Sequence, residues 1–532
     1  MEDENSLIAQ RREKLGALQA RGANPFGRAY EISGTIAEVC EKFSDGAALR
    51  VAGRITAHRD MGKSHFVDLR DSTGRIQVYI HAKEVGLEAI EMFKLVDLGD
   101  FIGVEGTCFL TKTGEPTLKV HKLELLGKSL RPLPEKWHGL QDVEARYRQR
   151  YLDLLTNEQS RAVFEKRITI VREIRNFMEA RGFLEVETPM LQSVAGGAAA
   201  EPFRTNHKAL GLELYLRIAP ELYLKRLLVG GFNKVFELNR NFRNEGISRK
   251  HNPEFTMLEA YWAYADFEKM ADLVEEMICH LAKTLEERAS ASSEGRASAR
   301  PKTASEGEAR GEPPGKSETG SEGASPSQES GTSGSSSLRI EHRDEEGNVT
   351  RTINLTRPWR RARYRDLVRE IDPEWFNYTS EKRRERCAEL GVEINPRMAD
   401  YEVTQQVFEK LIEEKTFDPL FVTHCPKELV PLAKQNAEDD SLVDVYELII
   451  NGQEISPGYS ELNDPTTQRQ RLVEQAGEET QKIDEEFLLA LEHGMPAAGG
   501  FGLGVDRLTM LLTGAESIRD VILFPLLKPK SR

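Results

Sequence analysis

The chain has 532 residues, a formal net charge of −14 and five scattered cysteines. This length exceeds what one hydrophobic core supports, so at least two domains are expected. The acidic balance argues against general adhesion to nucleic acid, although a local basic face can still bind RNA, and the cysteines lack the spacing of a zinc site or a disulfide framework.

These features also bear on location. The sequence contains no run of about 20 apolar residues and no secretory or transit peptide pattern. We therefore expect a protein of the cytoplasm, a reducing compartment, with no membrane association and no bound zinc.

The N-terminal segment "SLIAQRREKLGALQARG" places Leu7, Leu15 and Leu18 near helical spacing and stops at Gly22. It predicts an amphipathic helix, and we interpret residues 1–45 as an N-terminal helical extension. Residues 46–130 then change to short alternating runs separated by Gly- and Asp-rich turns, which indicates a small antiparallel barrel or sandwich of about five strands.

A proline-punctuated linker, residues 131–155, leads into a larger domain of mixed α+β pattern, residues 156–532. This domain is interrupted between residues 286 and 346, where Ser, Gly, Glu, Ala and Pro dominate and large apolar residues are almost absent. Such a composition cannot bury enough surface to order itself. We predict a disordered insertion with the simple role of a linker.

Two alternating runs, "KVFELNRNFRN" and "PEFTMLEAYWAY", flank the charged stretch "EGISRKHN". They predict two antiparallel strands joined by a loop. Period-2 alternation places Phe255, Met257, Glu259 and Tyr261 on one face. A buried Glu259 requires a cation, which either a ligand or an Arg or Lys of the protein could supply.

The segment "VYELIINGQEISPGYSELND" carries a second hairpin signal. Asn451 and Gly452 fit a type I′ turn that pairs Ile449 with Glu454. Glu447 and Glu454 then share one face, where they could bind a divalent cation or form a solvated acidic surface.

Near the C-terminus, "GGFGLGVDRLTMLLTG" predicts a helix from Val505 to Thr513 that ends at Gly514. Arg507 falls in its first turn. A helix N-terminus beside an arginine favours phosphate binding, and the preceding glycines let backbone approach a nucleotide closely.

Together these stretches resemble a known family. "FRNEG" with "HNPEFTMLE" resembles the second signature motif of the class II aminoacyl-tRNA synthetases in its lysyl form. "RGFLEVETPML" is similar to the first motif and "GGFGLGVDRLTMLLTGAESIRDVILFP" to the third, and the resemblance covers nearly the whole chain outside the insertion. It implies an N-terminal OB-fold β-barrel and a class II catalytic domain built on an antiparallel sheet flanked by helices.

The resemblance further implies an enzyme that activates lysine with ATP to lysyl-adenylate and pyrophosphate, and then transfers lysine to tRNA(Lys). Magnesium would accompany ATP, and the enzyme would be a homodimer. The planar guanidinium of Arg243 could hold the α-phosphate and the attacking carboxylate together. Phe255 would stack under adenine and Arg507 would cover its other side.

The residues implied by the family motifs fall into six groups. Catalysis is assigned to Arg243, Arg507, Glu447 and Glu454; ATP binding to Arg243, Glu245, His251, Asn252, Phe255, Glu447, Gly504 and Arg507; metal binding to Glu447 and Glu454; lysine binding to Gly197, Glu221, Glu259, Tyr261, Tyr459 and Glu461; anticodon binding to Arg59, Phe66 and Gln77, with Pro189 at the dimer interface. Within the lysine group, Glu461 and Tyr261 would hold the side-chain ammonium and Glu221 the α-amino group.

One position departs from the family pattern. Pro457 stands in "EISPGYSE" where the lysyl family has an asparagine near the substrate carboxylate, and proline offers neither a side-chain amide nor a backbone N–H. Three alternatives stay open: a sister synthetase for aspartate or asparagine, a catalytically silent RNA-binding relative, and a synthetase-like enzyme that modifies a protein.

Overall fold

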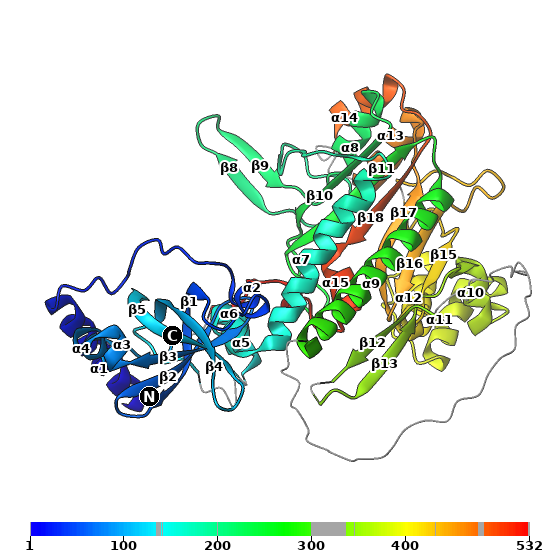
Figure 1. Cartoon of the computed structure of the whole chain (residues 1–532). Coiled ribbons are helices and arrows are strands. Elements are labelled where there is room, and N and C mark those ends of the chain that lie inside the picture. The colour runs from blue at the N-terminus through cyan, green and yellow to red at the C-terminus, as the bar shows by residue number, and fades with distance from the viewer. Residues whose placement is uncertain are drawn as a thin grey trace, which may run out of the picture. The chain divides into compact units, whose positions relative to one another are not determined.

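The computed structural model describes residues 2–134, 140, 142–198, 200–298, 337–344, 346–430, 432–476 and 483–529. The chain divides into two compact units, one containing Met1–Leu140 and the other Gln141–Arg288 and Ser327–Arg532. Figure 1 shows the chain in colour order. None of the described helices carries an apolar stretch long enough to traverse a bilayer.

The first unit is a closed barrel with the strand order β1-β2-β3-β5-β4. Alternating residues such as Val51, Val67 and Val104 are fully buried inside it, as period-2 patterning requires. Leu18 of the N-terminal helix joins the same core. The elements are α1 (Glu2–Ala20), α2 (Ile36–Glu41), β1 (Ala48–Asp60), β2 (Ser64–Arg70), β3 (Arg75–His81), α3 (Ala82–Val85), α4 (Leu87–Phe93), β4 (Phe101–Leu110) and β5 (Pro116–Gly127).

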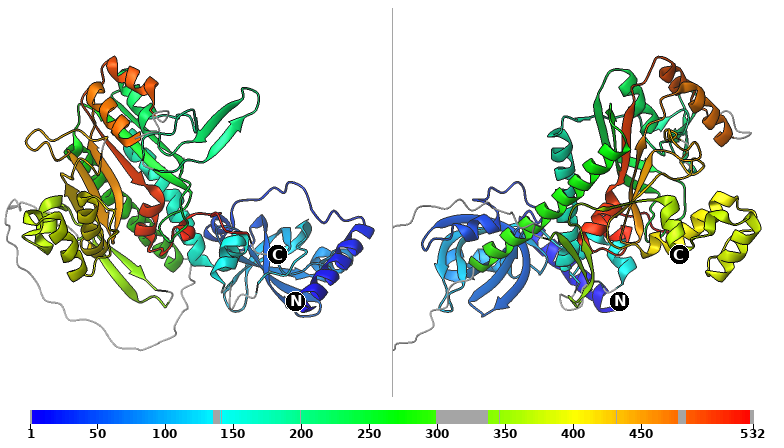
Figure 2. Two further views of the ribbon diagram at one scale, coloured as in Figure 1. Left: turned by 180° about the vertical axis from the view of Figure 1, so that it is seen from behind. Right: turned by 90° about the vertical axis from the view of Figure 1, so that its right-hand side faces the viewer.

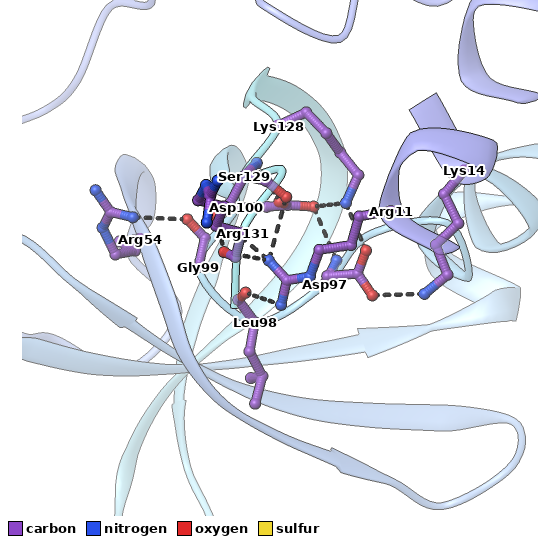
Figure 3. Close-up of polar contacts among 10 residues, drawn as sticks. All are labelled: Arg11, Lys14, Arg54, Asp97, Leu98, Gly99, Asp100, Lys128, Ser129 and Arg131. Atoms are coloured by element: carbon purple, nitrogen blue, oxygen red, sulfur yellow. Dashed lines mark hydrogen bonds and ion pairs between the residues drawn. The ribbon is translucent and has the colours of Figure 1, made fainter. Parts of the chain in front are cut away.

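An ionic network joins α1 to the end of the barrel (Figure 3). The Lys128 ammonium is buried 2.6 Å from a carboxylate oxygen of Asp97 and 2.9 Å from one of Asp100. Lys14 of α1 pairs with Asp97, and the Arg11 guanidinium donates to the backbone carbonyl of Leu98. The N-terminal helix is therefore packed onto the barrel through buried polar contacts as well as through apolar ones.

The second unit is built on an eight-stranded sheet in the order β14-β15-β16-β17-β18-β11-β10-β6. All neighbours are antiparallel except β10 with β6 and β14 with β15. The strands of this sheet are β6 (Leu184–Glu185), β10 (Lys234–Phe242), β11 (Glu254–Ala263), β14 (Arg360–Arg363), β15 (Leu420–Thr423), β16 (Val445–Ile450), β17 (Gln453–Ser460) and β18 (Ala498–Gly504).

Helices α7 and α9 run along one face of this sheet, as the views in Figure 1 and Figure 2 agree. Ile174 of α7 and Val274 of α9 share one apolar core with Leu258 of β11. The described helices of this unit are α5 (Val143–Arg148), α6 (Arg150–Thr156), α7 (Glu158–Glu179), α8 (Glu221–Val229), α9 (Phe267–Ser298), α10 (Tyr364–Ile371), α11 (Ser380–Glu389), α12 (Asp400–Leu411), α13 (Pro465–Ala476), α14 (Glu485–Glu492), α15 (Val505–Thr513) and α16 (Ile518–Val521).

Two smaller sheets complete the described fold. One has the order β7-β9-β8 and the other pairs β12 with β13. Their strands are β7 (Leu191–Gln192), β8 (Arg204–His207), β9 (Leu212–Leu216), β12 (Arg339–Arg343) and β13 (Val349–Asn354). The predicted α+β class, with an N-terminal barrel and a largely antiparallel sheet flanked by helices, is confirmed.

The structure corrects both edges of the interval 286–346. Helix α9 continues to Ser298, and β12 already begins at Arg339. Residues 289–298 include three alanines together with Glu294 and Arg296, and such residues can extend a helix that has already formed. Residues 299–336, on which the rest of that prediction falls, lie outside the described part of the chain.

Candidate active site

A cavity of about 500 Å³ opens in the second unit between β11, the β16–β17 hairpin and the start of α15. Elements far apart in sequence meet here because β17, β18 and β11 are neighbours in the sheet. The structure thus brings together every residue that the sequence assigned to ATP or metal binding. These residues are Arg243, Glu245, His251, Asn252, Phe255, Glu447, Glu454, Gly504 and Arg507.

Arg243 follows β10 at the entrance to this cavity. Its backbone N–H donates to the carbonyl of Pro253, which closes the loop between β10 and β11. Its guanidinium carbon lies 5.2 Å from the ring centre of Phe255, and its buried Nε has no hydrogen-bond partner among the described residues. A buried donor without a partner is costly, so this arrangement suits an anionic ligand.

Arg507 and His251 meet on the other side of the cavity. Arg507 donates one guanidinium N–H to the backbone oxygen of Glu454 and lies 3.1 Å from His251 Nε2 through the other. Burial and then Arg507 lower the pKa of His251. His251 is therefore neutral at pH 7, which lets its Nε2 accept from Arg507 while Nδ1 donates to the Ser248 hydroxyl.

Arg507 is held in place by the start of α15. Asp506 accepts a hydrogen bond of 2.7 Å from the backbone N–H of Thr256 and pairs with Arg167 at 2.6 Å. The helix runs from Val505 to Thr513 and ends at Gly514, whose φ of 75° is the left-handed conformation that glycine adopts readily. Both predicted ends of this helix are confirmed.

The predicted register of the β16–β17 hairpin is confirmed at the turn but not beyond it. Asn451 and Gly452 have φ angles of 57° and 69°, as a type I′ turn requires, and Ile449 pairs with Glu454. A register shift follows between Leu448 and Ile449, so that Glu447 lies opposite Pro457. The proline ring thus lines the cavity where the family pattern has an amide side chain.

Glu447 and Glu454 both face this cavity. Burial, then Glu454 and Glu413, raise the pKa of Glu447. Glu413 was absent from the sequence prediction; its carboxylate accepts from the backbone N–H of Glu454. Within the described residues no group of three or more His, Cys, Asp or Glu side chains could hold a metal ion. A cation here would therefore use two carboxylates together with oxygens of a ligand.

A second cluster of carboxylates lies further along the same face of β11, where Glu259 and Tyr261 follow Phe255 and Met257. Burial and then Glu221 raise the pKa of Glu259 to about 8, while Arg243 and Arg217 oppose the shift. The Tyr261 hydroxyl donates to Glu259 at 3.3 Å.

Glu221 and Glu461 close this cluster from α8 and from the end of β17. The Tyr459 hydroxyl donates to Glu221 at 3.1 Å. Gly197, with φ of 86°, approaches Glu221 so closely that a Cβ there would meet the Glu221 Cβ at 3.1 Å. The structure therefore brings the six residues predicted for lysine binding into one region.

Lys225, which the sequence prediction did not include, lies between Glu221 and Glu461. Its Nζ is 2.6 Å from Glu221 and 2.5 Å from Glu461. The available signal was a lysine four residues after a glutamate in the apolar segment "ELYLKRLL", since positions i and i+4 lie on one helix face. The cation that Glu461 contacts thus comes from the protein itself.

The three residues predicted for the anticodon lie on adjacent strands of the barrel. Arg59 is exposed and pairs across strands with Phe66, whose ring centre is 5.0 Å from that of Tyr79. Gln77 is buried, and its side-chain oxygen accepts from the Thr117 hydroxyl. Arg59 and Phe66 are accessible to a ligand, whereas Gln77 is occupied within the barrel. Pro189, in the second unit, is exposed between β6 and β7.

Comparisons with known proteins agree with this geometry. Residues 142–528 match the family model of class II tRNA synthetases (D, K and N), and residues 49–126 match that of the OB-fold nucleic acid binding domain. The chain is 45% identical to a "Lysine--tRNA ligase" of Pelotomaculum thermopropionicum, over 99% of this chain and 96% of that one. It is 44% identical to one of Carboxydothermus hydrogenoformans, over 99% of each, and 43% identical to one of Moorella thermoacetica, over 100% and 99%.

Proposed function

The chain belongs to the lysine-specific branch of the class II tRNA synthetases, and from this we propose how its residues join lysine to ATP and then to tRNA. As a tRNA ligase for lysine, it activates the amino acid and transfers it to tRNA(Lys). The relatives favour this function over the aspartate, asparagine, silent and protein-modifying alternatives. The observation that carries the assignment of roles is the single cavity into which all the predicted nucleotide-binding residues project.

At the nucleotide end, Arg243 binds the α-phosphate and the carboxylate that attacks it. Its unpartnered Nε and its place beside Phe255 support this role. Arg507, oriented by Glu454 and His251, lies across the same cavity and holds the other side of the nucleotide. Opposed cations of this kind stabilise the charge that develops at phosphorus.

Glu447 and Glu454 are the residues that would hold magnesium. Burial and neighbouring carboxylates raise the pKa of Glu447, so a divalent cation relieves an unfavourable concentration of negative charge. Two carboxylates with substrate phosphates form a common magnesium environment. The ion would supply charge neutralisation at the phosphates, while the protein aligns the two reactants.

At the amino-acid end, Glu461 meets the side-chain ammonium of lysine. Both oxygens of this buried carboxylate lack a well-aligned hydrogen-bond donor among the described residues, and only Oε2 pairs with Lys225. Oε1 is left for a ligand. Glu221, with Tyr459 and the backbone of Gly197, binds the α-amino group. The same face of β11 carries Phe255, which lies beside Arg243.

The test is amino-acid-dependent pyrophosphate exchange. Wild-type exchange should be driven by lysine, with no exchange above background for aspartate or asparagine. Glu461→Gln should retain the fold and the KM for ATP but lower kcat/KM for lysine by about 2 kcal/mol, the scale of a charge-assisted hydrogen bond. Unchanged lysine kinetics in this variant would remove Glu461 from the lysine site.

We further infer that the enzyme is a homodimer formed through α7. Ile168 is 63% exposed on this helix and Leu523 is 42% exposed near it. Both line a cavity of about 730 Å³ with Phe164 and Val171. A second copy of the chain is the proposed occupant, since it would cover these exposed apolar side chains and could pair with the charged residues among them, such as Glu165 and Arg172.

Sedimentation measurements test this dimer. Ile168→Arg should shift the enzyme to monomer, because an unpaired charge at the centre of an apolar interface is costly. Leu87→Arg, at an exposed residue of the barrel unit, is the matched control and should leave the dimer intact. A wild-type monomer, or a dimeric Ile168→Arg, would count against this interface.

We also propose that the enzyme works in the cytoplasm. All five cysteines are free, and four of them are buried. Unpaired cysteines fit a reducing compartment. Fractionation of cells that express the tagged chain would test this location.

A further inference from the structure

Lys225 has no assigned role in the reaction, yet it occupies the centre of the proposed lysine site. Its side chain is completely buried, and its Nζ contacts Glu221 of α8 and Glu461 at the end of β17. We propose that Lys225 is a positioning residue for lysine specificity: its ammonium favours the ionised form of Glu461 and engages one carboxylate oxygen, leaving the other for the substrate ammonium. This inference rests on the lysine site proposed above.

The geometry separates the two oxygens of Glu461. Oε2 lies 2.5 Å from Lys225 Nζ, whereas Oε1 is directed to the backbone of β18, where a Cβ added at Gly500 would come within 2.0 Å of it. Glycine at this position is therefore needed, because any side chain there would displace Oε1. A carboxylate has enough acceptor sites to contact two ammonium groups, one internal and one from the substrate.

The charges around Glu461 show why an internal cation is needed. Two buried carboxylates, Glu221 and Glu461, contact one buried cation, Lys225, while Glu259 lies on β11, which β18 separates from β17. The titratable groups that interact with Glu461 from the surrounding elements are Glu221 and Lys225 of α8, Tyr261 of β11, and Tyr459 of β17.

The causes of the pKa shifts show what Lys225 contributes. The pKa of Glu461 is raised above its ordinary value, because burial and Glu221 outweigh the opposing effect of Lys225. Burial alone would lower the pKa of Lys225, but Glu221 and Glu461 outweigh it and raise that pKa, so Lys225 stays charged. Without its ammonium Glu461 would take up a proton more readily, and a neutral carboxylic acid attracts an ammonium only weakly.

The experiment is the pH profile of lysine-dependent pyrophosphate exchange at saturating ATP. Lys225→Met should move the rising limb of kcat/KM for lysine to higher pH by about one unit or more, giving about tenfold loss near pH 7 that is largely recovered above about pH 9. The KM for ATP should stay within about twofold of wild type. A loss of the same size at every pH would overturn the proposal, because a merely structural role would not shift the pH dependence of kcat/KM.

The chain offers a matched control in Lys128, which is also buried between two carboxylates, Asp97 and Asp100, but belongs to the barrel unit (Figure 3). Lys128→Met should destabilise the protein yet leave the pH midpoint of lysine activation unchanged. A shift equal to that of Lys225→Met would show a general effect of removing a buried lysine, and would overturn the assignment.

A double-mutant cycle tests whether Lys225 acts through Glu461. Adding Lys225→Met to Glu461→Gln should change kcat/KM for lysine by less than about threefold, since the carboxylate to be ionised is already gone. If the double variant instead loses kcat/KM by the product of the two single losses, the proposal is overturned.

Lys225→Arg retains the charge, so the pH midpoint of kcat/KM for lysine should stay at the wild-type value even if activity falls. This variant also tests the proposal if Lys225→Met does not fold. A shifted midpoint in Lys225→Arg would also overturn the proposal. Wild-type exchange without lysine dependence would instead overturn the proposed function itself.

Discussion

Three buried carboxylates give the proposed lysine site its negative charge. Glu259, Glu221 and Glu461 come from β11, from α8 and from the end of β17, and each is almost completely buried. Placing them in one region costs folding free energy unless cations or protons compensate them. We therefore expect these carboxylates to lower the free energy of unfolding of the ligand-free enzyme while they favour binding of the lysine cation.

Glu259 makes this cost measurable. Its pKa is raised to about 8 in the folded protein, mainly by burial, from an ordinary 4.5. A raised folded pKa means that the native state retains a proton which the unfolded state releases, so the stability contribution is complete below about pH 4.5 and is lost as pH rises towards 8. Glu259→Gln should match wild type near pH 5 and be more stable by at least about 1 kcal/mol near pH 9.

Thermal unfolding of the ligand-free protein across this pH range is the measurement. The glutamine can still accept a hydrogen bond from the Tyr261 hydroxyl, so the packing is preserved. A constant stability difference between variant and wild type at all pH values would contradict the raised pKa.

Phe66 allows a residue-scale test of RNA recognition. Its ring is partly exposed on the barrel beside Arg59, which suits stacking of an unpaired base. Phe66→Ala should weaken tRNA charging by about 1–3 kcal/mol while leaving lysine-dependent pyrophosphate exchange unchanged. Because Phe66 also contacts Tyr79, equal losses in both half-reactions would identify it as a packing residue instead.

At the scale of elements, the β16–β17 hairpin decides where the two metal-binding candidates lie. The turn at Asn451 and Gly452 positions Glu454, and the register shift beyond it positions Glu447 opposite Pro457. The turn backbone is also anchored to the neighbouring segment, since Gly452 N–H donates to the carbonyl of Thr416. The distance between the two carboxylates therefore depends on the turn.

Gly452→Ala tests this dependence. The residue has φ of 69°, and an added Cβ would lie 3.0 Å from the backbone oxygen of Glu414, so the turn must shift. We expect a rise of at least about threefold in the magnesium concentration needed for half-maximal exchange. Gly391→Ala is the control, because it has φ of 71° but open space around its Cβ. A similar magnesium dependence in both variants would contradict the proposed link.

At the scale of the whole molecule, each of the two units has apolar packing of its own. The barrel has its own apolar core around Val67 and Val104, and the sheet of the second unit has another around Leu258 and Phe501. The two family matches, over residues 49–126 and 142–528, follow the same division. A substitution in one core should therefore leave the chemistry of the other unit largely intact.

The segment between α9 and β12 allows a test at this scale. Residues 299–336 are rich in Ser, Gly and Glu and almost free of large apolar side chains. Replacing them by a glycine–serine linker of equal length should leave lysine-dependent exchange within about tenfold of wild type, because the composition contributes nothing to a core. A greater loss, which corresponds to more than about 1.4 kcal/mol in the barrier, would assign this segment a catalytic role.

Local patterns in the sequence were sufficient for the elements and for most of the site. The ends of α15, the register of Ile449 with Glu454 and the paired strands β10 and β11 all follow from short-range periodicity and turn chemistry, which the chain encodes within a few residues. The family motifs then named candidate nucleotide-binding residues, and these candidates meet in one cavity.

Contacts between distant elements were decided only by the tertiary structure. The pairing of Lys225 with Glu461 requires that α8 pack on β11 and that β17 lie near it in the sheet, and no pattern within either segment specifies this. The same holds for Gln77, whose polar side chain is buried by its bond to Thr117, and for α9, which extends to Ser298. Burial and ion pairing depend on all the surrounding elements, whereas periodicity depends on one.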